Sequence, residues 1–565
     1  MSSGLACLGY GLLWVLPPDQ RGVSSLPDAA ESGSMTGFSV SEVHTGISAT
    51  AKLPKKRGRP RLALMSQSAA VVHKPAVTIG SGFPMTPNMN PVGYASARLA
   101  IDCLQYMNKH LCPQLVLADT PNNPHRLSVE HWSYFPQLVL DILISCVLVH
   151  QVVRSRFGPG LCTYESSRYS NGKLSRLKRP QLNAISHPSL PLIYQHQHEA
   201  ISALNLELQS PETRYSDVVL NIIIRLLVGS LQQSAYGWSA HQEAARTIIL
   251  HRGGFKKLAK EQGFSYKFSL SMFLQVDVMN AVMKSEAQLD MRTVKQLEFI
   301  PHLDSVFEDG FSSGFFCPNE VIQYLIRINF ARYLGAQTPN AREEATALSE
   351  DVFQQIISFS PAVWAERQVE RRYRPFYASS EHDTPDSSAV EAIQKIWVNL
   401  ATAFQAATLL YCLETLFVYQ PVPPKLPALA FTVVELGNSD DHGLDDLRKL
   451  KAALLTMLLN ALHSLWDTAT KENGLWCGRF CLWPCFIAGM ELDAYPTLEH
   501  ERTFVCSAIF DNCERLGNLC SLDVVMLLEA VYAKGAEERK AGRQYNSPWV
   551  ERLRDVGLTQ EATFF

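Results

Sequence analysis

From about residue 91 to the C-terminus, apolar residues recur at a spacing of three to four, and few stretches alternate as a half-buried strand would. This spacing puts the apolar side chains of a segment on one face of a helix. The predicted helices are 95–110, 136–156, 191–208, 216–236, 239–252, 268–284, 318–334, 341–358, 389–419, 444–470, 498–516 and 522–534. The expected fold class is therefore all-α, with residues 91–565 forming one large multi-helix body.

Residues 1–90 have a different character, because they are rich in Ser, Gly, Pro and Thr and show little hydrophobic periodicity. Such a segment is predicted to be a disordered N-terminal arm. Two polar segments, 157–189 and 373–388, are predicted to be surface loops within the helical body. Gly253-Gly254 follows a periodic segment and predicts a helix end. No fixed-period repeat is present, which disfavours a solenoid.

The first residues, Leu5–Leu16, are mostly apolar and end at Pro17-Pro18. The stretch is too short to span a bilayer, and it lacks the positive n-region of a secretory signal. It is interpreted either as a partner-binding tail or as a wrongly predicted gene start, and the second is favoured. Since no other stretch is expected to approach a membrane span, no membrane partner is expected.

Composition supports a large, well-packed body, since 47 % of the 565 residues are hydrophobic and 19 % are charged. The formal net charge is −3, so any contact with nucleic acid must come from a local basic patch. The 13 cysteines stand mostly singly in apolar stretches. They are predicted to be reduced, buried thiols of an intracellular protein.

A basic string supplies such a patch, because six of the ten residues 52–61 are Lys or Arg. Arg57 and Arg59 can enter the narrow, electronegative minor groove of A·T-rich DNA. Gly58 lets the backbone approach the groove floor, Pro60 keeps the segment extended, and the flanking cations can neutralise phosphates. The predicted DNA-binding residues are Lys55, Lys56, Arg57, Gly58, Arg59, Pro60 and Arg61.

This string resembles an AT-hook in its core tetrapeptide and its basic flanks. Two other interpretations stay open. Pro54–Arg57 can serve as a nuclear-import signal without touching DNA, and basic runs are often only solvated tails. The DNA and import interpretations both predict a nuclear protein.

No catalytic constellation is predicted, so the protein is not expected to be an enzyme. Gly310–Gly314 fits the Gly-x-Ser-x-Gly pattern of a nucleophile elbow but lacks the strand that must precede it. Asp440-Asp441 lies in a loop and fails the Asp-Asp-x-x-Asp pattern of a terpenoid cyclase. Neither a phosphate-binding Gly-rich loop nor a dinucleotide fingerprint is present, and no cofactor is expected.

No metal site is predicted either. Cys477, Cys481 and Cys485 recur every four residues, but their flanks are apolar, no histidine is near them, and Pro484 interrupts the helix, so packed core thiols are expected. His196 and His198 lie near Glu199, yet their spacing does not bring both to one helix face.

Two stretches of the body resemble the regulatory domain of fungus-specific transcription factors, a domain usually found behind an N-terminal zinc binuclear cluster. The first stretch comprises Tyr194–Leu208, a helix from Ser216-Asp217 through Leu226, and Trp238–Gly254. Its last part resembles the family's His-x-x-Gly-Ala … Arg-Gly-Gly segment, with Ala244 where the family commonly has Gly. Leu482–Glu491 is close to the family's Trp-Pro-x-Phe-Ile-Ala-Gly-x-Glu. The resemblance implies an all-α regulatory body that works in the nucleus, with other transcription regulators or a second copy of itself as partners.

The zinc cluster of the family needs six closely spaced cysteines, whereas residues 1–90 contain only Cys7. We therefore expect a nuclear transcription regulator that contacts A·T-rich DNA through its hook-like string, with a metabolic or secondary-metabolite gene set as its target. The alternatives are a nuclear regulatory or scaffold protein that does not bind DNA, and a truncated gene model of a zinc-cluster factor. Bodies of this kind can also hold a small apolar effector between helices, but the sequence does not place one.

Overall fold

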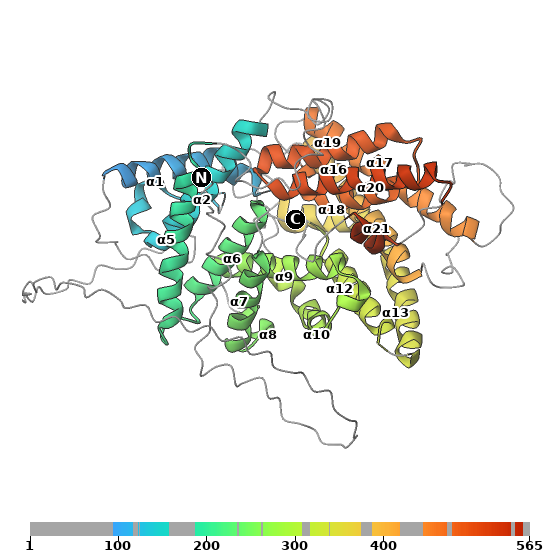
Figure 1. The fold of residues 1–565 in the computed structure, drawn as a ribbon, viewed down its shortest axis with the longest axis horizontal. Helices are drawn as coiled ribbons and strands as arrows, with labels where there is room; N and C mark the ends of the chain where they lie inside the picture. The colour runs from blue at the N-terminus through green and yellow to red at the C-terminus, as the bar shows by residue number, and fades with distance from the viewer. Residues whose placement is uncertain are drawn as a thin grey trace, which may run out of the picture. The chain divides into compact units, whose positions relative to one another are not determined.

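The computed structural model describes residues 94–116, 123, 125–157, 187–233, 237–260, 264–307, 317–337, 339–373, 387–417, 444–471, 477–543 and 548–556. These residues belong to one compact unit, and every regular element that they form is a helix (Figure 1). The all-α prediction is therefore confirmed for the described part of the chain. The predicted arm, residues 1–90, lies outside it.

The longer elements in chain order are α1 (Tyr94–Tyr106), α2 (Gln137–Phe157), α5 (Leu190–Gln209), α6 (Asp217–Gln232), α7 (Trp238–His251), α9 (Phe264–Met283), α12 (Asn319–Gly335), α13 (Pro339–Ser358), α14 (Pro361–Gln368), α16 (Ser387–Cys412), α17 (Leu444–Lys471), α18 (Leu482–Leu492), α19 (Glu499–Leu516), α20 (Leu519–Lys540) and α21 (Trp549–Asp555). Three short α-helices are α8 (Phe255–Leu258), α10 (Met291–Lys295) and α11 (Leu303–Phe307). The short segments of 3₁₀- or π-helix are η2 (Met107–Leu111), η3 (Cys112–Gln114), η4 (Val129–Tyr134), η6 (Glu286–Gln288), η7 (Gln296–His302), η8 (Val369–Tyr373), η9 (Leu413–Phe417) and η10 (Cys477–Phe480).

Each of the predicted helices corresponds to an observed one, but α18 differs from the sequence-based expectation. Pro484 was expected to interrupt a helix, whereas it is the third residue of α18. The first turn of a helix tolerates proline, because the N–H groups there have no partner within the helix. The backbone N–H of Cys485, the next residue, donates to the carbonyl of Cys481 at 2.8 Å. The expectation was therefore wrong, because Pro484 lies within the first turn of a helix and does not interrupt one.

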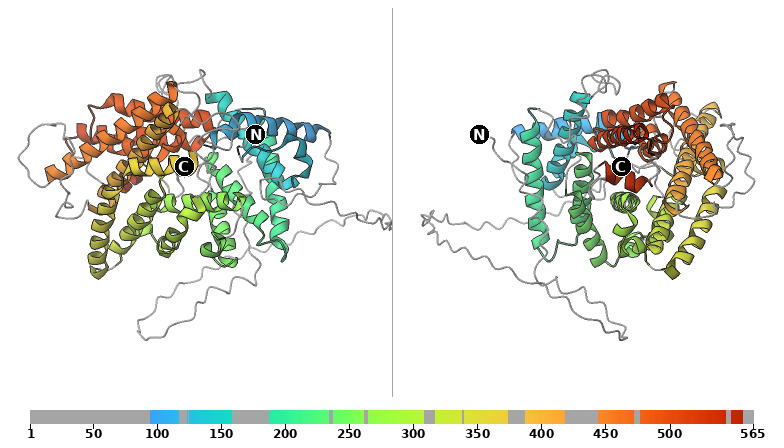
Figure 2. Two further views of the ribbon diagram at one scale, coloured as in Figure 1. Left: turned by 180° about the vertical axis from the view of Figure 1, so that it is seen from behind. Right: turned by 45° about the vertical axis from the view of Figure 1, so that its right-hand side comes forward.

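The C-terminal helices α16 to α20 gather on one side of the body, and α6, α7, α9 and α12 lie on the other (Figures 1 and 2). α16 packs against α14, α17 and α18, while α2 packs against α1, α5, α6 and α19. Segments far apart in the sequence thus form one core. The buried aromatic rings of Phe404 and Tyr411 on α16 contact Trp483 on α18, with centroid distances of 6.1 and 6.4 Å.

Helix α18 lies at the centre of this core, and every one of its residues is buried. The carbonyls at its C-terminal end cannot reach water and need partners inside the protein. Side chains from three later helices supply them. Tyr532 of α20 donates to the Gly489 carbonyl at 2.9 Å, Arg552 of α21 to Met490 at 3.1 Å, and Arg502 of α19 to Leu492 at 2.8 Å.

Arg552 also belongs to a network of ion pairs near the end of α18. Asp493, just after α18, lies 3.4 Å from Arg539 and 3.6 Å from Arg552. Glu414 is 3.9 Å from Arg552 and also pairs with Lys451 of α17. Cations near a helix C-terminus also interact favourably with the helix dipole. Each of these buried charges thus has an opposite charge beside it, which buried ions require.

The helix end predicted at Gly253-Gly254 is confirmed. Helix α7 ends at His251, and Gly253 and Gly254 have φ values of 99° and 84°, a region that side chains other than glycine rarely adopt. The Gly254 N–H donates to the Ile249 carbonyl at 2.9 Å, which closes the helix. The chain can then turn directly into α8.

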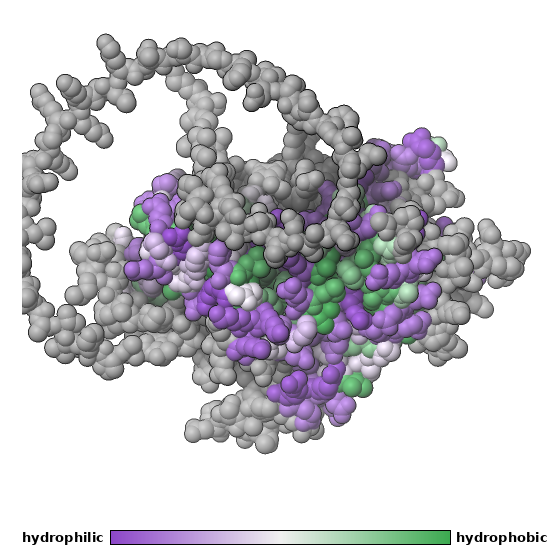
Figure 3. Space-filling view, turned by 90° about the horizontal axis from the view of Figure 1, so that it is seen from below, coloured by the Kyte–Doolittle hydropathy of each residue, from purple (hydrophilic) through white to green (hydrophobic). Residues whose placement is uncertain are grey.

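Two described helices are long and apolar enough to cross a membrane, so the expectation that no further stretch approaches a membrane span was wrong. They are Gln137–Ser155 in α2 and Val390–Phe417, which covers α16 and η9. In the most apolar window of each, 78 % and 83 % of the residues are buried inside the fold, as in core helices of a globular body. On the face shown in Figure 3, an apolar area lies between hydrophilic side chains.

The close packing of α18 on α20 gives a stability test. A Cβ atom on Gly489 would lie 2.5 Å from Cδ1 and 3.2 Å from Cγ of Leu528, which is fully buried and has no room to move. We expect Gly489→Ala to lower the free energy of unfolding by about 1–3 kcal/mol, measured by urea denaturation.

The matched control is Gly229→Ala in α6, where the new methyl group would meet Cys146 Sγ at an ordinary 3.6 Å. This change should be neutral or stabilising by up to about 1 kcal/mol, because alanine favours a helix over glycine. Equal effects of the two substitutions would show that the contact between α18 and α20 is not tight.

Candidate functional site

The seven residues predicted to contact DNA, Lys55 to Arg61, lie outside the described residues, so their role stays a prediction. The described body contains a different candidate site, a cavity of about 320 Å³ between α2, α6 and α9. Side chains of η2, η3, η10 and the α19–α20 junction complete its wall. Its volume lies at the lower end of the roughly 300–1,000 Å³ typical of small-molecule sites.

The wall of the cavity is chiefly apolar because the residues of α2, α6 and α9 that line it are mainly apolar. Each presents one face to the cavity, including Leu143 and Val147 of α2, Ile224 of α6 and Met272 and Val276 of α9. Met272 is only partly buried, as are Met107 and Leu111 in the same wall. The cavity thus leaves apolar surface without a protein partner.

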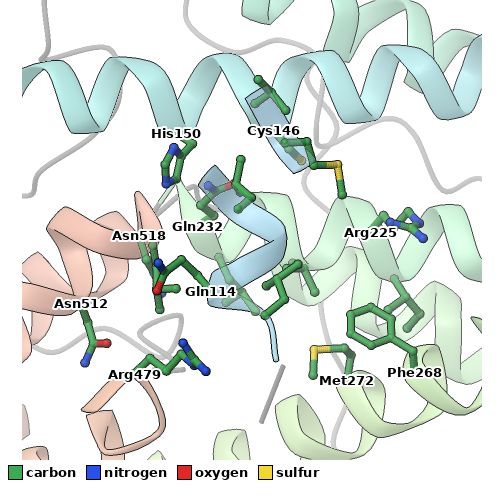
Figure 4. Close-up of a pocket in the computed structure, with 18 of the residues that line it drawn as sticks. Gln114, Cys146, His150, Arg225, Gln232, Phe268, Met272, Arg479, Asn512 and Asn518 are labelled. Atoms are coloured by element: carbon green, nitrogen blue, oxygen red, sulfur yellow. The ribbon is translucent and has the colours of Figure 1, made fainter. Parts of the chain in front are cut away.

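One cation in this wall has no counter-charge. Arg225, in the middle of α6, makes no hydrogen bond or ion pair with any described residue, and none of the described lining residues is acidic. Burial lowers the pKa of its guanidinium, and the only opposing influence comes from the nearby thiol of Cys146. Figure 4 shows Arg225 on the opposite side of the cavity from Arg479, Asn512 and Asn518.

Four buried polar atoms of uncharged side chains in the same wall also have no hydrogen-bond partner. They are the amide nitrogen of Gln275, the amide oxygen of Asn512, the hydroxyl of Ser521 and the indole nitrogen of Trp483. Buried polar groups of folded proteins are nearly always hydrogen-bonded, so such a group usually has a specific reason. Here four such groups line one cavity.

His150 of α2 connects this wall to the C-terminal helices. Its Nδ1 lies 3.0 Å from the Tyr106 hydroxyl, and its Nε2 lies 3.1 Å from the Arg515 carbonyl of α19. Gly517 packs so closely that a Cβ there would lie 2.9 Å from the His150 Cα atom. Burial is the main reason that the pKa of His150 falls from 6.5 to about 4, and the neighbouring charges of Arg154 and His110 lower it further.

Histidines 196 and 198 lie on different faces of α5, as expected, because His196 is buried and His198 is exposed. The partner of His196 is Asp141 of α2 at 2.9 Å, a contact that no sequence pattern indicated. With Glu199, these two residues form the one group in the described part of the chain whose ligand atoms are close enough to hold a metal ion. Asp141 Oδ1 already accepts a hydrogen bond from Gln137 at 2.9 Å, so a structural buried pair explains the contact.

The cysteines of the 477–485 segment behave as core thiols where their side chains are described. Cys481 and Cys485 are fully buried, and burial raises the pKa of the Cys485 thiol, which opposes formation of a metal-binding thiolate. The side chain of Cys477 and the pattern Gly310–Gly314 lie outside the described residues. The ten cysteines that the structure describes are free thiols, as predicted.

Sequence reasoning missed Arg225 and Gln275, although one signal was available. Arg225 is the only charged residue between Val218 and Gln232 in an otherwise apolar helix. A charged residue in the middle of such a helix indicates either a buried ion-pair partner or a ligand-binding site. Gln275 gives a weaker signal, because α9 contains several polar residues.

The segments that carried the family resemblance have structural roles. Trp238, His241 and Ala245 of α7 are buried, and Arg252 pairs with Asp217 at the start of α6. The second segment is the central helix α18. Two such landmarks in an all-α body define the helical regulatory domain of a transcription factor.

A family model for the fungal specific transcription factor domain matches residues 169–529, and the chain belongs to this family. The phomenoic acid biosynthesis cluster-specific transcriptional regulator of Leptosphaeria maculans is 23 % identical over 346 residues. The match covers 60 % of this chain and 56 % of that regulator, so it extends over little more than half of the relative's length. No solved structure matches the chain.

The pKa of His150 predicts a dependence of stability on pH. Since its folded-state pKa, about 4, lies below the usual 6.5, the unfolded chain takes up a proton before the folded chain does as the pH falls. The stability that neutral His150 contributes is therefore lost progressively from pH 6.5 towards pH 4. By pH 5 the loss of unfolding free energy is about 2 kcal/mol. His150→Gln should reduce the loss of unfolding free energy between pH 7 and pH 5, measured by urea denaturation.

The control for this experiment is His198→Gln, which replaces an exposed histidine of α5 and should leave the pH dependence as in the unmodified protein. If His150→Gln shows the same pH dependence as the unmodified protein, His150 does not titrate as described.

Proposed function

We propose that this protein is a nuclear transcription regulator that contacts A·T-rich DNA through Lys55–Arg61 and is regulated through its helical body. The observation that carries the regulatory part is the family match over residues 169–529. Membership of this family favours a regulator over an enzyme. The DNA contact is supported by the Arg-Gly-Arg-Pro core with basic flanks, in a chain whose net charge of −3 makes a diffuse nucleic-acid surface unfavourable.

We further propose that its targets form a metabolic or secondary-metabolite gene set. The relative from Leptosphaeria maculans is named as the regulator of one biosynthesis cluster, which supports this proposal. A single minor-groove contact distinguishes little beyond A·T from G·C pairs. Selection of particular promoters would therefore come from a homodimer or from other transcription regulators.

DNA binding by the hook-like string can be tested with the full-length protein and duplexes of A·T-rich or G·C-rich sequence. We expect micromolar binding that favours the A·T-rich duplex and weakens steeply with salt, as for about three to six neutralised phosphates. Replacing Arg57 and Arg59 by Ala should abolish the A·T preference in fluorescence anisotropy.

The control is the double variant Lys55→Ala with Lys56→Ala, which removes phosphate contacts. It should lower the affinity for both duplexes alike and reduce the salt dependence of binding. Unchanged binding of both duplexes by the Arg57/Arg59 variant would contradict minor-groove binding by the hook-like string. It would favour a scaffold protein that does not bind DNA.

Nuclear import is a separate test of the same segment. A tagged full-length protein should concentrate in nuclei, and a deletion of residues 52–61 should not, since this run is the densest group of cations in the chain. The Arg57/Arg59 variant separates the two roles, because it keeps four of the six basic residues of the run. If the variant that lacks residues 52–61 still accumulates in nuclei, another segment of the chain directs import.

A further inference from the structure

The cavity between α2, α6 and α9 leaves apolar side chains partly uncovered inside a tightly packed core. Met107, Leu111 and Met272 line it and are only partly buried, although each packs against the main hydrophobic cluster. Removing apolar surface from water is favourable, so a molecule with an apolar body is stabilised in this space. Water alone would leave this apolar surface uncovered, whereas a ligand with an apolar body would cover it.

Arg225 gives this site a charge preference. Desolvation of an unpaired guanidinium is unfavourable, and an anion beside it would offset that cost. The planar guanidinium fork matches a carboxylate, which can accept two parallel hydrogen bonds. Since none of the described lining residues is acidic, no side chain in this wall competes with a bound anion for Arg225.

The polar atoms without partners define the rest of the ligand. The Gln275 amide nitrogen of α9 can donate to a ligand oxygen, and so can the indole N–H of Trp483. The Ser521 hydroxyl and the Asn512 amide oxygen can accept from a ligand hydroxyl. These groups are few compared with the apolar side chains, which disfavours a sugar or a nucleotide and favours a mainly hydrocarbon body with one or two oxygens.

We propose that this cavity binds a small amphipathic organic acid, with its carboxylate paired to Arg225 and its apolar body lying between α2 and α9. Such an acid would be an effector of the helical body. Its role as an effector rests on the proposed function, whereas its binding does not.

The test uses the full-length protein without DNA and two probe acids, decanoate and 4-hexylbenzoate, each compared with its methyl ester by isothermal titration calorimetry. At least one acid should bind more tightly than its ester. Arg225→Gln should raise the Kd of that acid on the order of 10–100-fold, the usual effect of losing a charge-assisted hydrogen bond. The Kd of the ester should not change.

Further variants separate charge from shape. Arg225→Lys should keep most of the affinity for the acid, and Arg98→Gln, at an exposed position of α1, should keep all of it. Met272→Trp, which fills the cavity, should weaken acid and ester alike. Arg225→Met provides a readout without ligand, because removing a partly buried charge that has no described ion-pair partner should leave Tm unchanged or raise it.

The proposal is overturned if neither acid binds, if acid and ester bind equally, or if Arg225→Gln leaves the acid affinity unchanged. The double variant of Arg57 and Arg59 should bind the acid as the unmodified protein does. Loss of DNA binding and loss of acid binding are thus observed separately, and failure of one proposal leaves the other testable.

Discussion

The carbonyl end of α18 is the constraint on which much of the fold depends. A helix buried over its whole length must satisfy its last carbonyls inside the protein, and Arg502, Tyr532 and Arg552 do so from three different helices. These hydrogen bonds fix the positions of α19, α20 and α21 around one apolar axis. The same helix contributes Leu482 and Trp483 to the wall of the cavity. The stability of the core and the shape of the candidate site therefore depend on the same element.

Sequence periodicity was sufficient to place most of the helices, because amphipathic spacing is a local property that survives in the fold. The end of α7 was equally predictable, since Gly253 and Gly254 adopt the left-handed conformations that their residue type allows. α18 was missed because its residues are apolar on all faces and its proline lies in the first turn. A completely buried helix has no polar face, and periodicity cannot detect it.

The cavity could not be predicted, because its wall combines residues that are far apart in the chain. The hydrogen bond from His150 to the Arg515 carbonyl joins positions separated by 365 residues. No local pattern predicts such a contact. Only the isolated charge of Arg225 in an apolar helix indicated that α6 borders a buried partner or a binding site. The hook-like string is the opposite case, because seven consecutive residues carry its whole chemistry. The basic string can therefore be found from the sequence, whereas the cavity forms only when the chain folds.

The separation between α2 and the helices that cover it has a consequence for the synthesis of the protein. α2 packs against α19, which leaves the ribosome about 365 residues later. At roughly 5–20 residues per second, this delay is on the order of 20–70 s. During that time an apolar helix long enough to resemble a membrane span has no C-terminal partner. The nascent chain therefore exposes an apolar segment of the kind that chaperones shield until its C-terminal helices have been made.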